Sequence, residues 1–411
     1  MNLTDDINRI CFLDTETRSQ PGVWPPYNSV VSAGTAAYFE HGAQVVIMTY
    51  AIGMKPVQCV ALPTFERRMR WPDLPADLQD FLRLACDKGD RWVAAWNAGF
   101  DRAAMTIGMD GLEVLRPDNF IDIMAQAVAS NLPPNLDGAC RALKIEGKQE
   151  DGGELINLFA DGDGPSPAER PEEWEHYKGY GKRDADRLRE CFLRTRALPR
   201  EEWEDYWVSE EINDRGMAID VEFARRCAAI AELNSERAHE RMNAATGGLV
   251  TKVTQAERLK NWVYDNCRHA EAREIMVKAY DENSEDDLKP AKLGLDRNRI
   301  ETLLAFYDKL EEEQDGLDLI DFDIATALEI RQWDGSASPG KFAKMLVQRR
   351  QSDNALAGSY VFNGAQQTGR YSSRGVQTHN LPRAFVGQKM DPQRRDAEAE
   401  IIELINSLED F

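Results

Sequence analysis

Asp14 and Glu16 are the first residues in this sequence whose types and spacing could support chemistry. They stand two positions apart at the end of the apolar run Ile10–Leu13. On a strand, side chains two apart point to the same face. Two adjacent carboxylates repel unless a cation binds between them, so the pair suits Mg²⁺ or Mn²⁺, which take oxygen ligands. Asp-x-Glu is expected about once by chance in a chain of this length, so a solvated strand end is the simpler explanation of the pair alone.

Two further polar pairs have a regular spacing. Asn97 and Asp101, four apart, follow a predicted strand and open a predicted helix. Asp101 would lie near the helix N-terminus, where negative charge is stabilised, so a capping acid is its simplest explanation. Tyr180 and Asp184, also four apart, share one face of a later predicted helix, and an ordinary surface pair would look the same. Neither pair alone indicates a site.

The order of the three groups is far more specific than any one of them. Asp-x-Glu, Asn-x-x-x-Asp and Tyr-x-x-x-Asp, within one α/β block, resemble the Exo I, Exo II and Exo III motifs of the DEDDy 3′–5′ exonucleases. The resemblance implies an RNase H-like fold and two divalent ions, Mg²⁺ or Mn²⁺, that promote in-line attack of water on a phosphodiester. It implies four metal ligands: Asp14, Glu16, Asp101 and Asp184. It also implies that Tyr180 orients the attacking water and that Asn97 supports the substrate. Phe100 is expected in the wall of the site, where its ring could wedge a 3′-terminal base.

A second resemblance lies in the other half of the chain. The segment Phe362–Ser373, which contains Thr-Gly-Arg-Tyr-Ser-Ser, continues into Gln377 and Asn380-Leu-Pro-Arg. It resembles the T-G-R-x-S-S…Q-N-x-P segment of A-family DNA polymerases, particularly those of phages and prophages. Glu211–Asp220 resembles the segment that begins their polymerase region, so the resemblance covers about residues 9–385. The sequence departs from the pattern at Thr378-His379, where relatives usually carry an apolar residue and Gln. Imidazole does not offer the paired donor and acceptor of an amide, so His379 is not expected to reproduce the template-side hydrogen bonds of that Gln.

The charge of the chain is unevenly distributed. The whole chain has a formal net charge of −21, which by itself argues against a nucleic-acid partner. Residues 341–383, however, contain seven basic residues and one acidic residue, a local charge of +6. Basic side chains among Gly, Ser and Asn donors grip phosphates without reading sequence, although a loop beside a solvated helix could have the same composition. The residues expected to contact DNA are Lys341, Lys344, Arg349, Arg350, Thr368, Arg370, Ser372, Ser373, Gln377, Asn380 and Arg383.

The catalytic motifs of a polymerase are missing after this segment. A-family polymerases carry two catalytic aspartates in palm motifs that follow the T-G-R segment. Only 28 residues follow Arg383 here, and they contain no such motif. We therefore expect no polymerisation by this chain alone, with a palm and fingers supplied either by a longer chain or by a second subunit. The apolar side of a predicted helix at 396–411 could meet that missing part, or could simply face a core.

The elements that must position these residues divide the chain into two parts. Apolar runs predict strands at 10–13, 45–52, 57–61 and 92–96, with a hairpin joining the second and third. Helical patterns follow at 76–87, 101–108, 120–130, 135–143 and 171–197. Pro199 ends the last of these helices, which predicts a domain boundary near 198–200. Charged amphipathic segments at 200–214, 220–245, 255–267, 296–313 and 339–351 predict a mostly helical second half.

The predicted fold class is α/β: an RNase H-like 3′–5′ exonuclease domain, with a mixed sheet flanked by helices, followed by a mostly helical thumb-like region. The predicted domains are the exonuclease at 1–198, the thumb-like region at 199–340, and the DNA-contacting T-G-R segment with its C-terminal helix at 341–411. Seven scattered cysteines, no visible signal peptide and no apolar run of membrane-spanning length predict reduced thiols and a cytoplasmic location, in a bacterial host if a phage encodes the chain.

These observations predict a proofreading 3′–5′ exodeoxyribonuclease that belongs to an A-family DNA polymerase and binds primer-template and single-stranded 3′ ends. Two alternatives stay open. One is a stand-alone DEDDy exonuclease that acts on RNA, against which the T-G-R segment argues. The other is a non-catalytic subunit that clamps DNA for a split polymerase.

Overall fold

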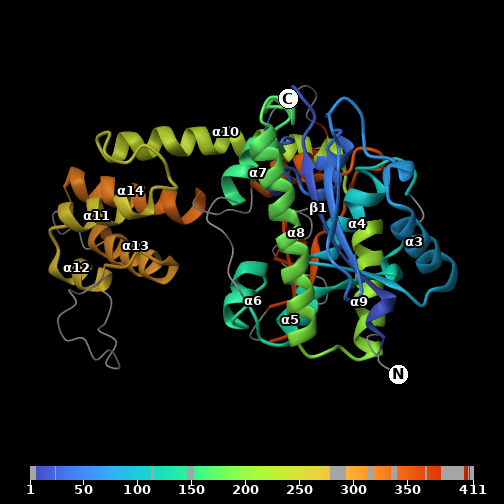
Figure 1. Cartoon of the computed structure of the whole chain (residues 1–411). Coiled ribbons are helices and arrows are strands. Elements are labelled where there is room, and N and C mark those ends of the chain that lie inside the picture. Colours follow the sequence, from blue (N-terminus) through green and yellow to red (C-terminus); the bar gives the residue numbers. More distant parts are fainter. Residues whose placement is uncertain are drawn as a thin grey trace. The chain divides into compact units, whose positions relative to one another are not determined.

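The computed structural model describes residues 6–23, 25–112, 115–145, 152–277, 293–312, 318–334, 340–365, 368–380, 402–405 and 407. They fall into two compact units (Figure 1). The first lies within Met1–Val221 and Lys344–Gln388, and the second within Glu222–Ala343 and Lys389–Phe411. The predicted DNA contact Arg383 lies outside the described residues, as does most of the predicted helix at 396–411. The predicted boundary near 198–200 precedes a helix that belongs to the first unit.

The first unit is built on a five-stranded mixed sheet in the order β3-β2-β1-β4-β5. Its strands are β1 (Ile10–Arg18), β2 (Gln44–Ile52), β3 (Gln58–Ala61), β4 (Trp92–Ala95) and β5 (Phe120–Asp122). β2 runs antiparallel to both β1 and β3, whereas β4 runs parallel to β1 and β5. The predicted mixed α/β architecture is confirmed, including the β2–β3 hairpin.

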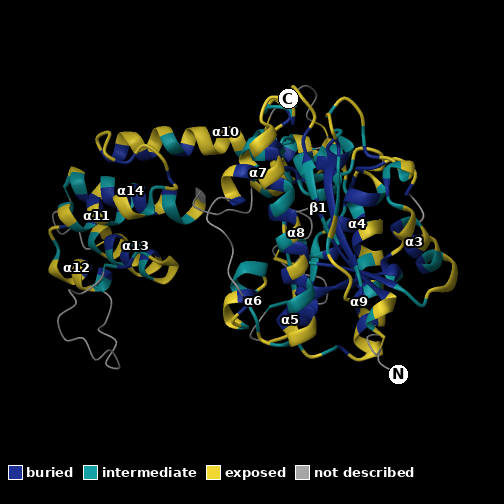
Figure 2. Cartoon of the chain, in the orientation of Figure 1, coloured by how far each residue is buried: buried dark blue, intermediate teal, exposed yellow. Residues whose placement is uncertain are grey.

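Helices cover both faces of this sheet, and alternate residues of β1 enter two separate cores. Cys11 and Leu13 join one core, while Ile10 and Phe12 join the other. Figure 2 shows the central strands buried between helices with exposed outer surfaces. The helices of the unit are α1 (Val30–Ala33), α2 (Thr35–Glu40), α3 (Ala76–Lys88), α4 (Ala98–Thr106), α5 (Ile123–Ala129), α6 (Leu136–Ala142), α7 (Gly152–Ala160), α8 (Pro171–Arg194) and α9 (Arg200–Arg215).

Two elements of the sheet differ from the sequence prediction. β1 continues five residues past Leu13, because Asp14 to Arg18 keep pairing with β2, so both acids lie inside the strand and not at its end. The predicted helix at 120–130 is instead β5 followed by α5. A short apolar run is ambiguous between a strand and a buried helix, and pairing with β4 decides this one.

Two small two-stranded sheets complete the first unit. β6 (Met217–Ala218) pairs with β7 (Ala355–Leu356), and β8 (Tyr360–Ala365) pairs with β9 (Arg370–Ser373). The Thr-Gly-Arg sequence turns the chain from β8 into β9, where Gly369 has a φ of +61° that favours glycine. The segment is therefore a β-hairpin. α15 (Gly340–Gln348) leads into β7.

The second unit is helical, as predicted. It contains α10 (Val221–Ala245), α11 (Ala256–Asn266), α12 (Ala270–Met276), α13 (Arg297–Glu312) and α14 (Leu319–Asp334). These helices share a core that includes Met242, Leu259, Leu303 and Leu328. In neither unit does a described helix have both the length and the apolar character needed to cross a membrane. All seven cysteines are free thiols.

Candidate active site

The two acids of β1 face helix α8. Asp14 and Glu16 lie on the same strand face as Phe12, whose ring meets Phe192 of α8 edge to face at 5.3 Å. Nearer the start of α8, the Tyr177 hydroxyl donates a hydrogen bond to Glu16 Oε2 at 2.8 Å. α8 thus runs along the face that carries both carboxylates and supplies groups to them.

A glycine lets α8 approach the sheet beside Asp14. Thr49, which pairs with Asp14 across the β1–β2 ladder, donates from Oγ1 to the Gly181 carbonyl at 3.1 Å. A Cβ atom at Gly181 would stand 3.2 Å from Thr49 Cγ2, which is tighter than ordinary contact. Because Gly181 lies between Tyr180 and Asp184 in the sequence, this close approach brings both members of the Tyr-x-x-x-Asp pair to the sheet.

Asp101 reaches β1 from the other neighbouring strand. The β1–β4 ladder runs from Ile10 to Phe12, so the Thr15 N–H lies beyond it. Asp101, in the first turn of α4, accepts that N–H at 3.0 Å and the Thr15 hydroxyl at 2.7 Å through Oδ1. β1 and β4 are parallel, so the end of β4 delivers α4 to the same edge where the acids of β1 stand. Three separate elements, β1, α4 and α8, therefore converge here.

The acids of this edge are buried and repel one another. Burial raises the pKa of Glu16 well above its usual value, Asp14 raises it further, and the Tyr177 hydrogen bond opposes the rise. Burial and then Asp14 also raise the pKa of Asp101, against the two bonds from Thr15. Such carboxylates are costly to ionise without a compensating positive charge.

The donor set fits a hard divalent cation, because it consists of carboxylate oxygens whose mutual repulsion a cation would relieve. In the described part of the chain, however, no three His, Cys, Asp or Glu side chains already form a group that could hold a metal ion. Asp184 instead accepts a hydrogen bond from Arg187 at 3.1 Å, within α8. The convergence of the acids is observed, and a closed ligand shell is not.

Tyr180 lies against Asp184 rather than in solvent. Burial raises its pKa, and both the charge of Asp184 and a hydrogen bond between the two side chains raise it further. Its ring packs on α7, where any side chain at Gly152 would collide with it. The phenol is therefore held protonated, as a hydrogen-bond donor, on the helix that faces β1.

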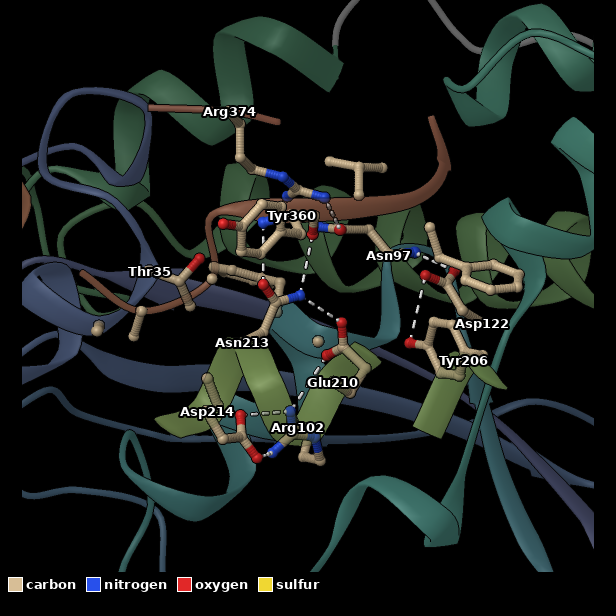
Figure 3. Close-up of a pocket in the computed structure, with 18 of the residues that line it drawn as sticks. Thr35, Asn97, Arg102, Asp122, Tyr206, Glu210, Asn213, Asp214, Tyr360 and Arg374 are labelled. Atoms are coloured by element: carbon tan, nitrogen blue, oxygen red, sulfur yellow. Dashed lines mark hydrogen bonds and ion pairs between the residues drawn. The ribbon is translucent and has the colours of Figure 1, made fainter. Parts of the chain in front are cut away.

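The two predicted substrate residues line a different feature. Asn97 and Phe100 border a cavity of about 110 Å³ between α4, α9 and β8 (Figure 3). Asn97 adopts a φ of +60° just before α4, and its N–H donates to the buried Asp122 at 3.0 Å. Its side-chain oxygen accepts from Arg374 at 3.0 Å. The structure thus brings Asn97 to the T-G-R hairpin.

The same cavity wall joins α4 to the segment that follows the predicted exonuclease. Arg102, the residue after Asp101, makes two hydrogen bonds of 2.7 Å to Asp214. Asn213 exchanges two hydrogen bonds of 2.9 Å with the backbone of Tyr360 in β8. Figure 3 shows these pairs side by side. The helix of Asp101 is therefore braced by both segments that resemble polymerase sequences.

The predicted DNA contacts differ in their exposure to solvent. Arg350 donates hydrogen bonds to the Asp353 carboxylate at 2.6 Å and to the Asp214 carbonyl at 2.7 Å. The hydroxyl of Ser373 is buried and has no hydrogen-bond partner. Arg349 also has local partners. Exposed positions are Lys344, Thr368, Arg370, Gln377 and Asn380, whereas Lys341 and Ser372 are half-buried.

Comparison with known proteins adds an independent finding. No family model matches the sequence. The chain is 26% identical over 393 residues to the "DNA polymerase" of Bacillus phage SP02, across 92% of this chain and 53% of that protein. The chain is a homologue of a phage DNA polymerase. It spans about half the length of that relative.

The solved structures include the POL domain of Pol1 from M. smegmatis in complex with DNA primer-template and dNTP. It aligns with 86% of this chain and 51% of its own, at 12% identity and a TM-score of 0.47. A likeness of that size does not identify a shared function.

The structure adds residues to the site of this polymerase homologue that the sequence prediction missed. Tyr177 lies three residues before Tyr180, so the i, i+3 spacing on α8 was a usable signal. Thr15 lies between the two acids of β1, where nothing in its type marks it as a partner of Asp101. Arg187 likewise follows Asp184 at the i, i+3 spacing.

Proposed function

We propose that the chain is the N-terminal portion of an A-family DNA polymerase, and that its first unit contains an RNase H-like DEDDy 3′–5′ exonuclease that proofreads DNA. The observation that carries the proposal is the convergence of β1, α4 and α8 on buried, mutually repelling carboxylates. The similarity to a phage DNA polymerase along 92% of the chain supports the polymerase context.

The chemistry proposed is hydrolysis of the 3′-terminal phosphodiester. Asp14, Glu16, Asp101 and Asp184 would hold two divalent cations, Mg²⁺ or Mn²⁺, which neutralise charge on the phosphate and lower the pKa of a bound water. Tyr180, whose protonated phenol lies beside Asp184, would orient the attacking water. Asn97 and Phe100 would support the substrate strand. No nucleophilic side chain is needed.

The remaining parts of the proposal concern DNA and the polymerase reaction. The T-G-R hairpin would contact the backbone of primer-template, and residues 199–340 would form a thumb-like region. Since the phage relative is about twice as long as this chain, polymerisation would depend on a palm and fingers in cis or in trans. The location proposed is the cytoplasm of a bacterial host.

The test is degradation of a 3′-labelled primer in Mg²⁺. The double variant Asp14→Ala/Glu16→Ala should lose the activity, whereas Asp186→Asn, a change to an exposed acid on α8, should retain it. Equal rates for the double variant and the wild type would overturn the site assignment.

Two further measurements separate the alternatives. Faster removal of nucleotides from RNA than from DNA would favour a stand-alone RNA exonuclease. Absence of Mn²⁺ binding in isothermal titration, together with intact duplex binding, would favour a non-catalytic DNA clamp.

A further inference from the structure

Tyr177 is a buried tyrosine that the exonuclease motifs do not include. The Tyr-x-x-x-Asp pair is Tyr180 and Asp184, and Tyr177 lies nearly one helical turn earlier on α8. Its side chain has no exposed surface, yet its hydroxyl reaches Glu16 Oε2 at 2.8 Å. A fully buried phenol whose hydroxyl donates to a single carboxylate suggests a role in orienting that carboxylate.

The ring of Tyr177 is held firmly by other aromatic residues. Phe159 of α7 stacks on it with a centroid distance of 5.6 Å, and Trp174 meets it edge to face at 5.9 Å. Tyr180 lies on another side at 6.3 Å. Aromatic contacts of this kind fix the plane of a ring in a packed core. The hydroxyl therefore points to a constant place, set by α7 and α8 together.

The Glu16 side chain needs a contact that fixes its orientation. A Glu side chain has three rotatable bonds, and the β1–β2 register shifts between Glu16 and Thr17. An irregularity of this kind changes the direction of a strand side chain. A neutral O–H donor on an ionised carboxylate makes a strong hydrogen bond and brings no charge that would compete with a cation. With Oε2 engaged by Tyr177, Oε1 is the oxygen that could bind a cation shared with the other acids.

We propose that Tyr177 is a positioning residue, which fixes the Glu16 carboxylate so that Oε1 is presented for divalent-cation binding. This inference rests on the proposed exonuclease function and names a determinant of its metal affinity. It predicts that the hydroxyl, and not the ring, matters. Partners of this kind typically contribute about 10- to 100-fold to metal affinity or activity.

The test uses Tyr177→Phe in the full chain, because Phe keeps the stacked ring and removes one oxygen. Tyr38→Phe is the matched control, since Tyr38 is also buried and its hydroxyl meets Thr17 Oγ1, on the same strand, at 3.3 Å. Titration with MnCl₂ should show a Kd about 10-fold weaker for Tyr177→Phe and unchanged for Tyr38→Phe. The Mg²⁺ concentration for half-maximal primer degradation should rise by a similar factor, and the rate should recover at high Mg²⁺.

A double-mutant cycle separates positioning from general damage to the fold. In a Glu16→Gln background, Tyr177→Phe should weaken Mn²⁺ binding no further, because the carboxylate that it positions is gone. An equal loss in both backgrounds, or a wild-type Mn²⁺ affinity for Tyr177→Phe, would overturn the role of Tyr177 while leaving the exonuclease proposal standing. A wild-type chain that neither binds Mn²⁺ nor degrades a primer would overturn both.

Discussion

The guanidinium of Arg374 donates a hydrogen bond to the side-chain oxygen of Asn97, 277 residues earlier, at 3.0 Å. Asn97 belongs to the Asn-x-x-x-Asp group that introduces α4, and Arg374 follows the T-G-R hairpin directly. One segment resembles an exonuclease motif and the other a polymerase motif, and this pair of side chains is one of the contacts that join them within one compact unit.

This pair should contribute a small, measurable coupling. Arg374 is exposed, so solvent screens the contact and about 0.5 kcal/mol is expected. Urea unfolding of Asn97→Ala, Arg374→Ala and the double variant should show non-additivity of that size. The exposed Arg370, on the same hairpin, gives the control: Arg370→Ala combined with Asn97→Ala should be additive. Additive effects in both pairs would show that the contact does not form in solution.

The ion pair beside Asp101 should matter more. Arg102 is buried, and it makes two hydrogen bonds to Asp214 and one to Glu210 at 3.2 Å. Arg102→Met would leave the mostly buried Glu210 without its cation, so we expect a loss of about 3 kcal/mol in the free energy of unfolding. Asp214→Asn should cost under about 1 kcal/mol, because Asp214 is half-exposed and Asn keeps one acceptor. Chemical denaturation measures both, and equal losses would contradict this ranking.

The sequence could predict most of the sheet because four of its strands contain an apolar run. β2 and β4 match their predicted ranges closely, since their residues are buried on both faces. β5 could not be recognised, because three residues of a longer apolar run become a strand only through pairing with β4. Local pattern carries no information about such a partner.

For the candidate site, the sequence predicted residue types and order, but the contacts depended on tertiary structure. Asp14 and Glu16 share a strand face, as the period of two predicts. Asn97 contacts Arg374 only because a hairpin that begins more than 260 residues later lies beside the start of α4. The local sequence around Asn97 could not predict this contact. Thr15 acts on Asp101 only because the β1–β4 ladder ends at Phe12.

A buried carboxyl near the cavity should make stability depend on pH. Burial, and then the charge of Glu210, raise the pKa of Asp122 to about 6 from 3.8. The folded chain then takes up a proton at this group at higher pH than the unfolded chain does. Stability from this group is therefore present at low pH and is lost as the pH rises through about 6.

Asp122→Asn should remove this dependence, because an amide does not ionise. The fold should tolerate the change, since Asn Oδ1 can still accept the Asn97 and Met124 N–H groups. At pH 8 the variant should be more stable than the wild type by up to about 2–3 kcal/mol, and the difference should shrink as the pH falls toward 4. Asp186→Asn, at an exposed position, should show a flat difference over the same range. Urea titrations at several pH values measure both, and a pH-independent effect of Asp122→Asn would contradict the prediction.

Two glycines on α8 allow the approach of that helix to be tested. Alanine in a helix interior is favoured over glycine by about 0.5–1 kcal/mol. At Gly179 a Cβ atom would lie 3.6 Å from Arg183 Nη1, an ordinary contact, so Gly179→Ala should gain that stability and leave primer degradation unchanged. At Gly181 the Cβ atom would press on Thr49, at 3.2 Å, and α8 must move away from the strand that pairs with Asp14.

Gly181→Ala should therefore lose the expected gain in stability and degrade a 3′-labelled primer at least about 10-fold more slowly than Gly179→Ala, because the proposed metal ligands on β1 and α8 would separate. Thermal unfolding and single-turnover primer degradation measure the two effects. Thr49→Ser, which keeps the hydroxyl that bonds to the Gly181 carbonyl but removes the crowding methyl, should restore part of the rate in the Gly181→Ala background. A Gly181→Ala chain that is both stabilised and fully active would show that the close approach of α8 to β2 does not set the geometry of the acids.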